Sequence, residues 1–337
     1  SKYQITITSR VVVSSCGSLQ TPALLLRSGL KNYNIGRYLK LHPVTPVAGY
    51  FPGTETELGE GVSMGTYVPD LMDLENTGYG VAAETPPGHP GLMTLSFPWA
   101  SMFGSRLNPL FFRHSACFIG ICRDRSSASN RVTIDRQGRP RIHYSLTAED
   151  QATVLAGQQH QLSLLRAAGA KVVFPFTQGV ERFYCREGTA SEKENQEFQE
   201  YLTEKVKKTG LPKYTAQVFS AHQMGSCRMG ANPKEGAIKE SGETWEVKDL
   251  YIADASTFPT SLGINPMITV QAVALKIAKG IAESLIGSNT DVLFSKTKKT
   301  DTKNSEELPH TGFDRDGWGE KNHLNGHYGV DLDSLKW

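Results

Sequence analysis

The sequence predicts an α/β protein whose middle section is of the α+β type. Near the N-terminus a β-prone stretch, a glycine turn and an apolar helix follow one another, and near residue 250 a short apolar strand leads toward a long helix. Both patterns are typical of a parallel sheet covered by helices. Between them the β-prone segments are short and separated by turns, which favours an antiparallel sheet. With 337 residues, the chain is long enough for two subdomains or one large α/β body.

The first predicted element lies in "ITITSRVVVSSCG". Its continuous apolar run, Val11 to Val13, predicts a strand covered on both faces, closed by Cys16–Gly17. Thr21 is predicted to cap a helix that begins at Pro22 and stops at Gly29.

Three patterns define the middle section. "RVTIDRQGRPRIHY" predicts a β-hairpin over residues 131–144, with its turn at Gln137–Gly138. A helix is expected from a cap at Thr147 to a stop at Gly169. A second helix is expected over residues 191–210, where acidic residues precede basic ones, as the helix dipole prefers.

Parallel-strand character returns near the C-terminal end. Leu250 to Ala253 predict a buried strand that ends at Asp254, and Pro266 is expected to begin a long helix. Apolar residues recur at every fourth position of that helix and predict one core-facing stripe: Val273, Ile277, Ile281 and Leu285. After Gly287 the sequence is polar and glycine-dotted, which predicts a mostly disordered tail over residues 288–337.

The bulk composition argues against several classes of protein. The formal net charge is +2, from 36 basic and 34 acidic residues, and no basic stripe stands out, so nothing favours a nucleic acid partner. No apolar run reaches the ~18 residues that a membrane-spanning helix needs. The first residues also lack the ordered features of a signal peptide.

The cysteines and scattered histidines predict no metal centre. Five dispersed cysteines do not resemble a disulfide framework. The group His114, Cys117 and Cys122 is interrupted by apolar residues and has no matching second pair, so buried thiols are favoured over a zinc site. The histidines of the tail are interpreted as part of a solvated loop: His310, His323 and His327.

One stretch stands apart from this pattern. "FSAHQMGSCRMG", which begins at Phe219, is too rich in glycine for a helix interior and too interrupted for a strand. It holds His222 on tightly bending backbone. From the residues alone, His222 is either a buried histidine with a hydrogen-bond partner or a group that handles a proton.

Three stretches resemble the glucose–methanol–choline (GMC) oxidoreductases, which are flavoenzymes. "GSLQTPALLLRSGL" at residues 17–30 resembles the second signature of that family, and "NIGRYLKLHP" at 34–43 resembles the segment that follows it. "HQMGSCRMG" with "VKDLYIADASTFPTSLGINPMITVQAVALKIA" resembles the C-terminal, flavin-site half of the family. The resemblance covers about residues 10 to 287 and is weakest in the middle. The sequence around His222 is most similar to that of the long-chain fatty alcohol oxidases.

The resemblance implies roles for two residues. The histidine of this motif faces the flavin in the family, so His222 is expected to be the base that takes the hydroxyl proton, while the flavin takes the hydride. Asn265 stands where the family carries histidine or asparagine. Since an amide does not take a proton at neutral pH, Asn265 is expected to hold the substrate oxygen by a hydrogen bond. The alternative is that Asn265–Pro266 only starts a helix.

The cofactor that the resemblance implies is FAD. Asp254 and Ala255 are expected beside its ribityl and diphosphate part, largely through backbone contacts, although Asp254 alone is equally typical of a turn or cap. The free N–H groups of the helix start are expected to stabilise the charge that arrives with the hydride. Met267 suits the flavin ring or core filling equally. The full expected FAD-binding set is Asp254, Ala255, Asn265, Pro266, Met267 and Thr269.

The phosphate-binding loop of a dinucleotide fold does not occur in the sequence. "GYGVAA" at residues 78–83 is followed by "ETPPGHP", which cannot form the required helix. We therefore expect the N-terminal half of the family fold to be missing from this chain. The predicted domains are part of an FAD-binding domain (1–46), an antiparallel-sheet substrate-binding domain (47–217), the C-terminal segment of the FAD-binding domain with His222 and Asn265 (218–287), and the tail (288–337).

The predicted reaction is the FAD-dependent oxidation of long-chain primary alcohols to aldehydes, with O2 reduced to H2O2. A GMC dehydrogenase or a sterol-type oxidase uses the same pair of residues, and an inactive truncated fragment that binds no FAD is a third interpretation. The expected partners are the alcohol and O2, with membrane association implied by the resemblance alone. The apolar residues of "LMTLSFPWASMFG" suit a pocket for an alkyl chain and ordinary core packing equally.

Overall fold

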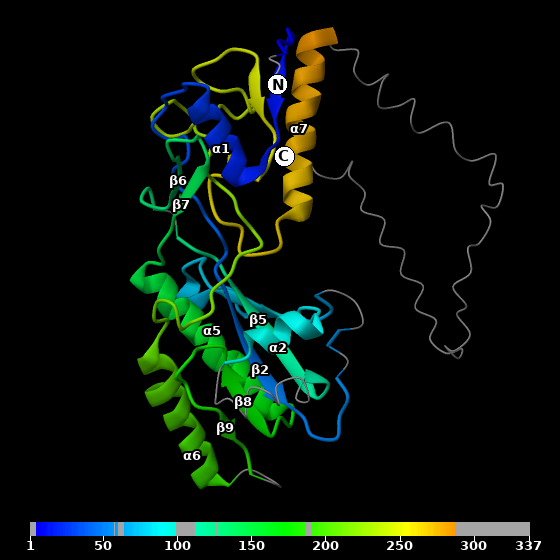
Figure 1. Cartoon of the computed structure of the whole chain (residues 1–337), viewed down its shortest axis with the longest axis vertical. Helices are drawn as coiled ribbons and strands as arrows, with labels where there is room; N and C mark the ends of the chain where they lie inside the picture. The colour runs from blue at the N-terminus through cyan, green and yellow to red at the C-terminus, as the bar shows by residue number, and fades with distance from the viewer. Residues whose placement is uncertain are drawn as a thin grey trace, which may run out of the picture. The chain divides into compact units, whose positions relative to one another are not determined.

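The computed structural model describes residues 5–56, 58–59, 64–98, 112–125, 127–186 and 191–286 (Figure 1). The chain divides into one compact unit from Ser1 to Gly287 and a second from Ser288 to Trp337. All described residues belong to the first unit, and the tail predicted over residues 288–337 lies outside them.

A short parallel strand pair brings together the two ends of the first unit. β1 (Val12–Ser14) pairs in parallel with β10 (Leu250–Ile252), as predicted. Among the described residues this sheet has no further strand. The expected cover on both faces of β1 is therefore wrong for this part of the chain: Val12 is 51% exposed and Val13 47%.

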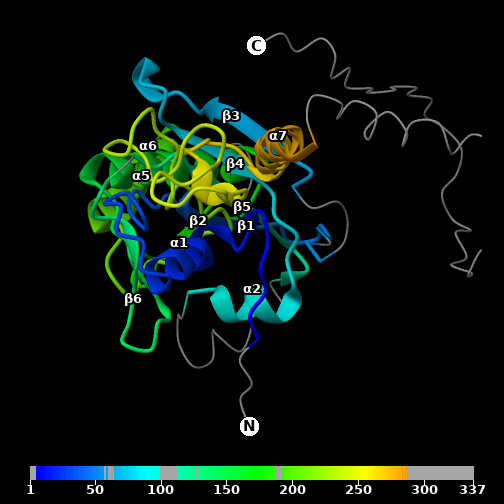
Figure 2. The same ribbon diagram turned by 90° about the horizontal axis from the view of Figure 1, so that it is seen from above.

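The helix after β1 starts earlier than predicted. α1 (Gly17–Arg27) lies next to β1 (Figures 1 and 2) and contains Thr21 and Pro22 in its interior, where the sequence suggested a cap and a first turn. Pro22 has no N–H to donate to the carbonyl of Ser18 one turn earlier. That carbonyl instead accepts a hydrogen bond from the hydroxyl of Ser226. A tertiary contact thus satisfies the group that Pro22 leaves free.

The middle of the chain forms a six-stranded antiparallel sheet, as predicted. The strands lie in the order β3-β4-β5-β2-β8-β9, and every neighbouring pair is antiparallel. Their bounds are β2 (Val44–Tyr50), β3 (Tyr67–Leu71), β4 (Val81–Glu84), β5 (Ser115–Cys122), β8 (Val172–Pro175) and β9 (Phe183–Tyr184).

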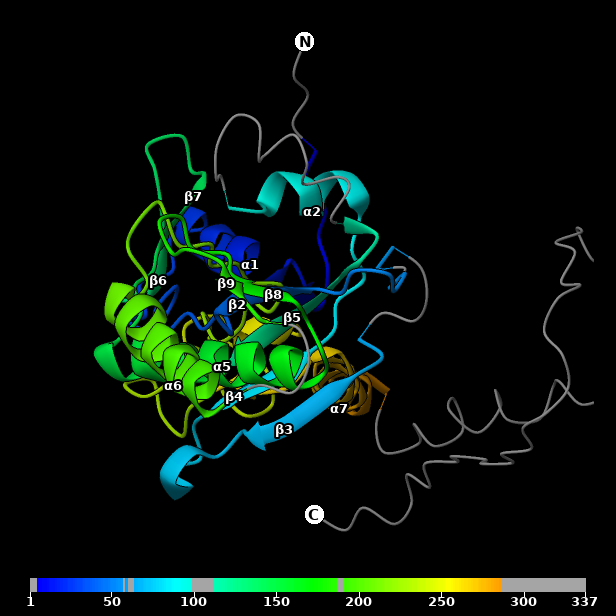
Figure 3. The same ribbon diagram turned by 90° about the horizontal axis from the view of Figure 1, so that it is seen from below.

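Helices lie on both sides of this sheet, as Figure 3 shows. α5 (Ala148–Ala167) packs on one face through a cluster that includes Val47, Leu162, Leu165 and Val173. α2 (Pro90–Ser96) lies on the other side, where a second apolar cluster includes Ala48, Phe97, Cys117, Phe174 and Phe176. Burial of these two faces forms the core of the middle section.

Three local predictions in the middle section are confirmed. β6 (Arg131–Ile134) and β7 (Pro140–His143) form the expected hairpin, with Gly138 at a positive φ of 74° in its turn. α5 starts after its cap Thr147, whose hydroxyl accepts from the N–H of Asp150. The charged segment forms α6 (Glu192–Glu200), which continues as the π-helix η2 (Tyr201–Lys207).

In the described part of the chain, the remaining elements are two 3-10 turns and the long C-terminal helix. The turns are η1 (Leu74–Asn76) and η3 (Ala255–Thr257), and α7 (Met267–Ile286) begins directly after Pro266, as predicted. In the predicted stripe of α7, Ile277 and Ile281 are buried, whereas Val273 and Leu285 are half-buried.

The two ends of the middle section meet in space. Val44, the first residue of β2, forms an antiparallel bridge with Phe219, and their two backbone hydrogen bonds measure 2.8 and 3.0 Å. The chain therefore enters and leaves the middle section at neighbouring points in space. The predicted boundary after residue 46 falls inside β2, and the three domain boundaries remain predictions.

Candidate active site

The motif around His222 lies against the segment around His42. "YLKLHPV" runs antiparallel to "FSAHQM", and Lys40 and Met224 exchange both backbone hydrogen bonds at 2.9 Å. The next bridge, between Val44 and Phe219, is offset by one residue from this register. His42 and His222 lie in the irregular stretch between the two bridges, where the two segments run side by side.

The two imidazole rings are in direct contact. His42 Nδ1 lies 3.2 Å from His222 Nδ1, with the ring planes at 89°. His42 Nε2 accepts a hydrogen bond from the backbone N–H of Gly263 at 2.8 Å. Because a neutral imidazole carries one hydrogen, that of His42 must sit on Nδ1, from where it is donated to His222. Neutral His222 therefore carries its own hydrogen on Nε2.

This tautomer determines which hydrogen bonds and proton transfers are open to His222 while its ring contacts His42. Its Nε2–H can donate a hydrogen bond to an oxygen atom, whereas its lone pair at Nδ1 is occupied by His42. Accepting a proton requires a free lone pair. The ring of His222 must therefore turn away from His42 before it can act as a base.

A buried carboxylate holds the backbone beneath His42. Asp124 accepts hydrogen bonds from the N–H groups of Leu41 and His42 at 3.0 and 3.2 Å, and from the hydroxyls of Tyr144 and Ser261 at 2.7 and 2.8 Å. Asp124 is 1% exposed, so these four bonds replace its lost hydration. They also hold His42 at a φ of 46°, a conformation that residues other than glycine rarely adopt.

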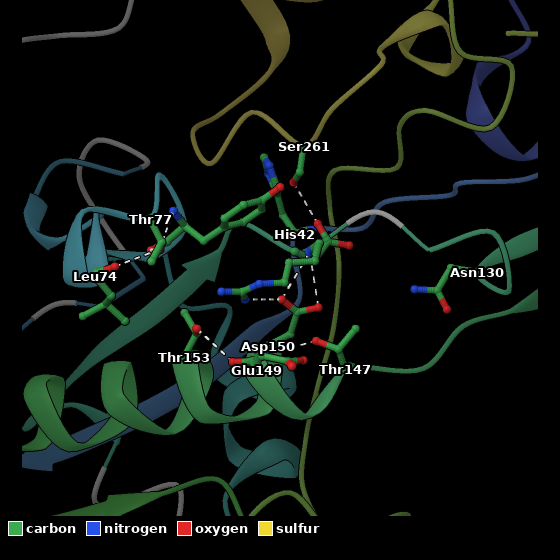
Figure 4. Close-up of polar contacts among 12 residues, drawn as sticks. His42, Leu74, Thr77, Asn130, Thr147, Glu149, Asp150, Thr153 and Ser261 are labelled. Atoms are coloured by element: carbon green, nitrogen blue, oxygen red, sulfur yellow. Dashed lines mark hydrogen bonds and ion pairs between the residues drawn. The ribbon is translucent and has the colours of Figure 1, made fainter. Parts of the chain in front are cut away.

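The N-terminus of α5 supports the same region (Figure 4). Asp150 accepts from the backbone N–H of Arg125 at 3.2 Å and from its guanidinium at 2.9 Å, while Thr147 caps the helix. Asp150 is buried, whereas the Arg125 side chain is 28% exposed, so this ion pair is only partly shielded from water. Arg125 directly follows Asp124, so the Arg125–Asp150 ion pair helps to hold Asp124 in the position where it accepts from the N–H of His42.

Burial keeps both rings uncharged near neutral pH. Desolvation lowers the pKa of His42 to about 3, with smaller contributions from the charges of His222 and Arg123. Burial also lowers the pKa of His222. The tautomers assigned above for neutral rings therefore apply at physiological pH.

We expect the substitution His42→Leu to make stability less dependent on pH in the acidic range. Unfolded His42 takes up a proton below pH 6.5, whereas the folded residue does so only near pH 3, so stability falls as pH falls between these values. On lowering the pH from about 7 to about 5, the wild type should lose about 2 kcal/mol more than His42→Leu. Urea unfolding at both pH values measures this difference. Equal losses in the two proteins would contradict the buried, neutral state of His42.

Gly225 is required by a close approach of two segments. It has a φ of +82°, and a Cβ atom there would lie 2.8 Å from Lys40 Nζ and 2.9 Å from the carbonyl oxygen of Tyr38. Lys40 is fully buried and donates to that carbonyl at 2.9 Å. Desolvation lowers the pKa of Lys40 to about 8, against the opposing effect of Asp124. A side chain at position 225 would therefore collide with Lys40 and Tyr38.

Asp254 joins three elements through its side chain. Its carboxylate accepts from the N–H of Gly17 at 3.0 Å, from the hydroxyl of Thr21 at 2.5 Å and from the N–H of Ser256 at 2.8 Å. It therefore ties the start of α1 to η3 at the end of β10. Ala255 follows in the same turn, and its carbonyl accepts from the N–H of Gly225 at 3.0 Å. Because the Asp254 carboxylate is already hydrogen-bonded within the protein, Asp254 and Ala255 would contact a cofactor through backbone groups, as the sequence suggested. That role remains a prediction.

Asn265 lies in the loop that leads into α7. Its Nδ2 donates to Oε1 of Glu84, at the end of β4, at 2.7 Å. Gly263, whose N–H binds His42, precedes Asn265 by two residues, so one loop connects the amide to the histidine pair. The other residues predicted to hold FAD lie at the start of α7: Pro266 and Thr269 are half-buried and Met267 is 68% exposed.

Sequence reasoning missed His42 and Glu84. His42 belongs to the quoted "NIGRYLKLHP", where a histidine before a proline was a visible signal, but nothing in the sequence tells that it faces His222. Glu84 ends the apolar run "GVAAE" on a buried strand. Acidic residues are rarely buried without a partner, so a glutamate at the end of a buried strand was a visible signal of a special role.

Within the described ranges no group of three or more histidine, cysteine or acidic residues is arranged to hold a metal ion. Cys117 and Cys122 are buried free thiols, as expected, and burial raises the pKa of Cys117 to about 12. The tail histidines lie outside the described residues. In the same described part, no helix has the length and apolar character that a membrane crossing requires.

Comparison with known proteins places the chain in a family. Two GMC oxidoreductase models match it, one over residues 1–44 and the other over residues 126–274. The chain belongs to the GMC oxidoreductase family. It has the mixed parallel and antiparallel fold of that family.

The chain is similar to named relatives over most of its described length. It is 37% identical over 286 residues to one long-chain-alcohol oxidase of Arabidopsis thaliana, covering 83% of this chain and 38% of the relative. A second Arabidopsis thaliana long-chain-alcohol oxidase is 36% identical over 285 residues, covering 84% and 36%. The chain thus spans less than two-fifths of the length of these relatives.

Solved structures support the fold. The formate oxidase of Aspergillus oryzae RIB40 superimposes with a TM-score of 0.52 at 14% identity, covering 82% of this chain and 54% of that one. Pyridoxine 4-oxidase from Mesorbium loti gives a TM-score of 0.50 at 17% identity, covering 80% and 50%. At these identities the likeness concerns the fold alone.

Proposed function

We propose that this chain provides the alcohol-binding side of an FAD-dependent oxidase. The reaction is the oxidation of long-chain primary alcohols to aldehydes, with the electrons passed to O2 to yield H2O2. The observation that carries the proposal is the identity of 36–37% to two long-chain-alcohol oxidases across more than four-fifths of this chain. The GMC motifs around His222 and Asn265 lie within the matched range.

The residues around the start of α7 fit a flavin. The first N–H groups of a helix have no partner within it and favour a nearby anionic group. Ile264, Met267 and Ile268 are exposed next to these groups, at 43%, 68% and 72%. A polar helix end flanked by apolar side chains suits the polar edge and the flat face of an isoalloxazine ring.

We assign the FAD contacts to the backbone around Asp254 and Ala255, to Asn265 and to the first turn of α7 with Pro266, Met267 and Thr269. A bound flavin supplies the hydride acceptor for the reaction.

His222 and Asn265 have complementary tasks in this proposal. With His42 in contact, Nε2–H of His222 donates to the alcohol oxygen and so binds and orients it. Once its ring leaves His42, His222 takes the hydroxyl proton as the carbon gives up its hydride. Asn265 holds the same oxygen from its own loop and moves no proton.

The test of the proposed function is a single-turnover experiment on the full-length protein that carries this chain. Mixed without oxygen with cetyl alcohol, the yellow protein should lose its flavin absorbance, and H2O2 should appear when oxygen is admitted. Ethanol serves as the matched short alcohol and should react far more slowly. A protein that binds no flavin, or whose flavin stays oxidised with every long-chain alcohol, would disprove the proposed function.

A further inference from the structure

Glu84 is a carboxyl group on an apolar face of the central sheet. It lies opposite Ile119 in β5, and alternate residues of a strand share a face, so Ile119 points to the same side as Cys117. Cys117 belongs to the apolar cluster with Phe97 and Phe174. Glu84 therefore lies on the aromatic side of the sheet, away from α5, and it is only 2% exposed.

The hydrogen bonding of this buried group is incomplete. Oε1 accepts from Nδ2 of Asn265 at 2.7 Å, whereas Oε2 has no hydrogen-bond partner among the residues that the structure describes. Burying a carboxyl group with one hydrogen bond costs free energy that an apolar residue at this position would not cost. A polar group retained at such a cost calls for a functional explanation.

The contact fixes the orientation of the Asn265 amide. A side-chain amide has a donor end and an acceptor end, and rotation by half a turn exchanges them. Because a carboxyl oxygen accepts, the NH2 end of Asn265 is directed to Glu84. The acceptor end, Oδ1, is thereby directed elsewhere and remains available for the hydrogen of a hydroxyl group.

We propose that Glu84 is a positioning residue that holds the Asn265 amide with Oδ1 toward the alcohol. In the bound state, with His42 in contact, Asn265 accepts from the hydroxyl while His222 donates to its oxygen. The hydroxyl directs its hydrogen to His222 only after the ring of His222 has left His42. The inference rests on the proposed function, because it presumes that Asn265 meets the alcohol. It also implies discrimination between substrate and product. An alcohol has a hydrogen to donate to Oδ1, whereas an aldehyde has none.

The substitution Glu84→Gln tests this assignment because glutamine has the same shape but either accepts from or donates to Asn265. The amide can then flip and present NH2. In the full-length protein, kcat/KM for cetyl alcohol should fall about tenfold, while inhibition by the corresponding aldehyde, which only accepts, should be unchanged or stronger. Glu75→Gln, which changes an exposed carboxyl in η1, is the matched control and should leave both values unchanged.

A double-mutant cycle tests whether Glu84 acts through Asn265. Asn265→Ala removes the amide, so adding Glu84→Gln to it should lower kcat/KM by no more than about twofold. If the two losses multiply, or if alcohol and aldehyde weaken together, the positioning role is wrong. Far-UV circular dichroism of each variant checks that the fold is retained.

The hydrogen bond between Glu84 and Asn265 can be tested by NMR, independently of any activity assay. In the flavin-free protein, the Nδ2 hydrogens of Asn265, assigned with Asn265→Ala, should shift in the NMR spectrum of Glu84→Gln and remain in place in Glu75→Gln. An unshifted resonance overturns the inference whatever the activity. A shifted resonance in a protein that oxidises no alcohol supports the Glu84–Asn265 contact and rejects the proposed function instead.

Discussion

Replacing His222 with glutamine should lower kcat for long-chain alcohols by about 10²- to 10⁴-fold, the usual contribution of a general base. Glutamine keeps an N–H donor near the position of Nε2 but cannot take a proton. Binding of the alcohol should therefore change little, so KM should stay within about threefold of the wild type. Steady-state and anaerobic single-turnover kinetics on the full-length protein separate these two effects.

The matched control for His222→Gln is His143→Gln, on the exposed hairpin strand β7. It removes one imidazole in the same way and should leave kcat unchanged. His222→Ala should lose binding as well as the proton acceptor, and added imidazole should restore part of its rate. A His222→Gln protein with a rate close to that of the wild type would reject His222 as the base.

Replacing Asp254 with alanine should lower the free energy of unfolding by about 3 kcal/mol. The substitution removes the acceptor of three hydrogen bonds, from Gly17, Thr21 and Ser256. Thr21 and Ser256 are fully buried, so water cannot replace the lost acceptor without disturbing the packing. Since typical domains are stable by about 5–15 kcal/mol, this loss should be visible as a large shift of the unfolding midpoint.

The measurement is denaturant unfolding of flavin-free protein, which separates a structural role of the carboxylate from a cofactor contact. Asp254→Asn, which keeps one acceptor oxygen, should lose less than Asp254→Ala. Asp73→Ala, at an exposed turn, should lose less than about 1 kcal/mol as the control. If Asp254→Ala unfolded like the wild type without flavin and differed only with flavin bound, the side chain would belong to the cofactor site.

Periodicity and turn residues predicted most of the architecture. The parallel pair, the antiparallel middle section, the hairpin and the Thr147 cap of α5 follow from local patterns that tertiary contacts reinforce. The start of α1 was predicted wrongly, because the carbonyl left free by Pro22 is satisfied by Ser226, which is about two hundred residues away in sequence. Local rules contain no information about such a partner.

The candidate site was predictable only in part, for a similar reason. His222 and Asn265 carry signals in their own motifs. His42 and Glu84 become relevant through contacts across the chain, with His222 and Asn265 respectively. The tautomer of His222 depends on Gly263 through His42, so no reading of residues 219–230 alone could have assigned it.

The bridge between Val44 and Phe219 has a consequence for how this family can diversify. An insertion whose first and last residues are hydrogen-bonded to each other can be exchanged as a cassette, because the joints on either side keep their spacing whatever lies between. The β1–β10 frame would then stay constant while the grafted sheet changes. Under the proposed function, alcohols of new shape would be accommodated in this way while the β1–β10 frame is left unchanged.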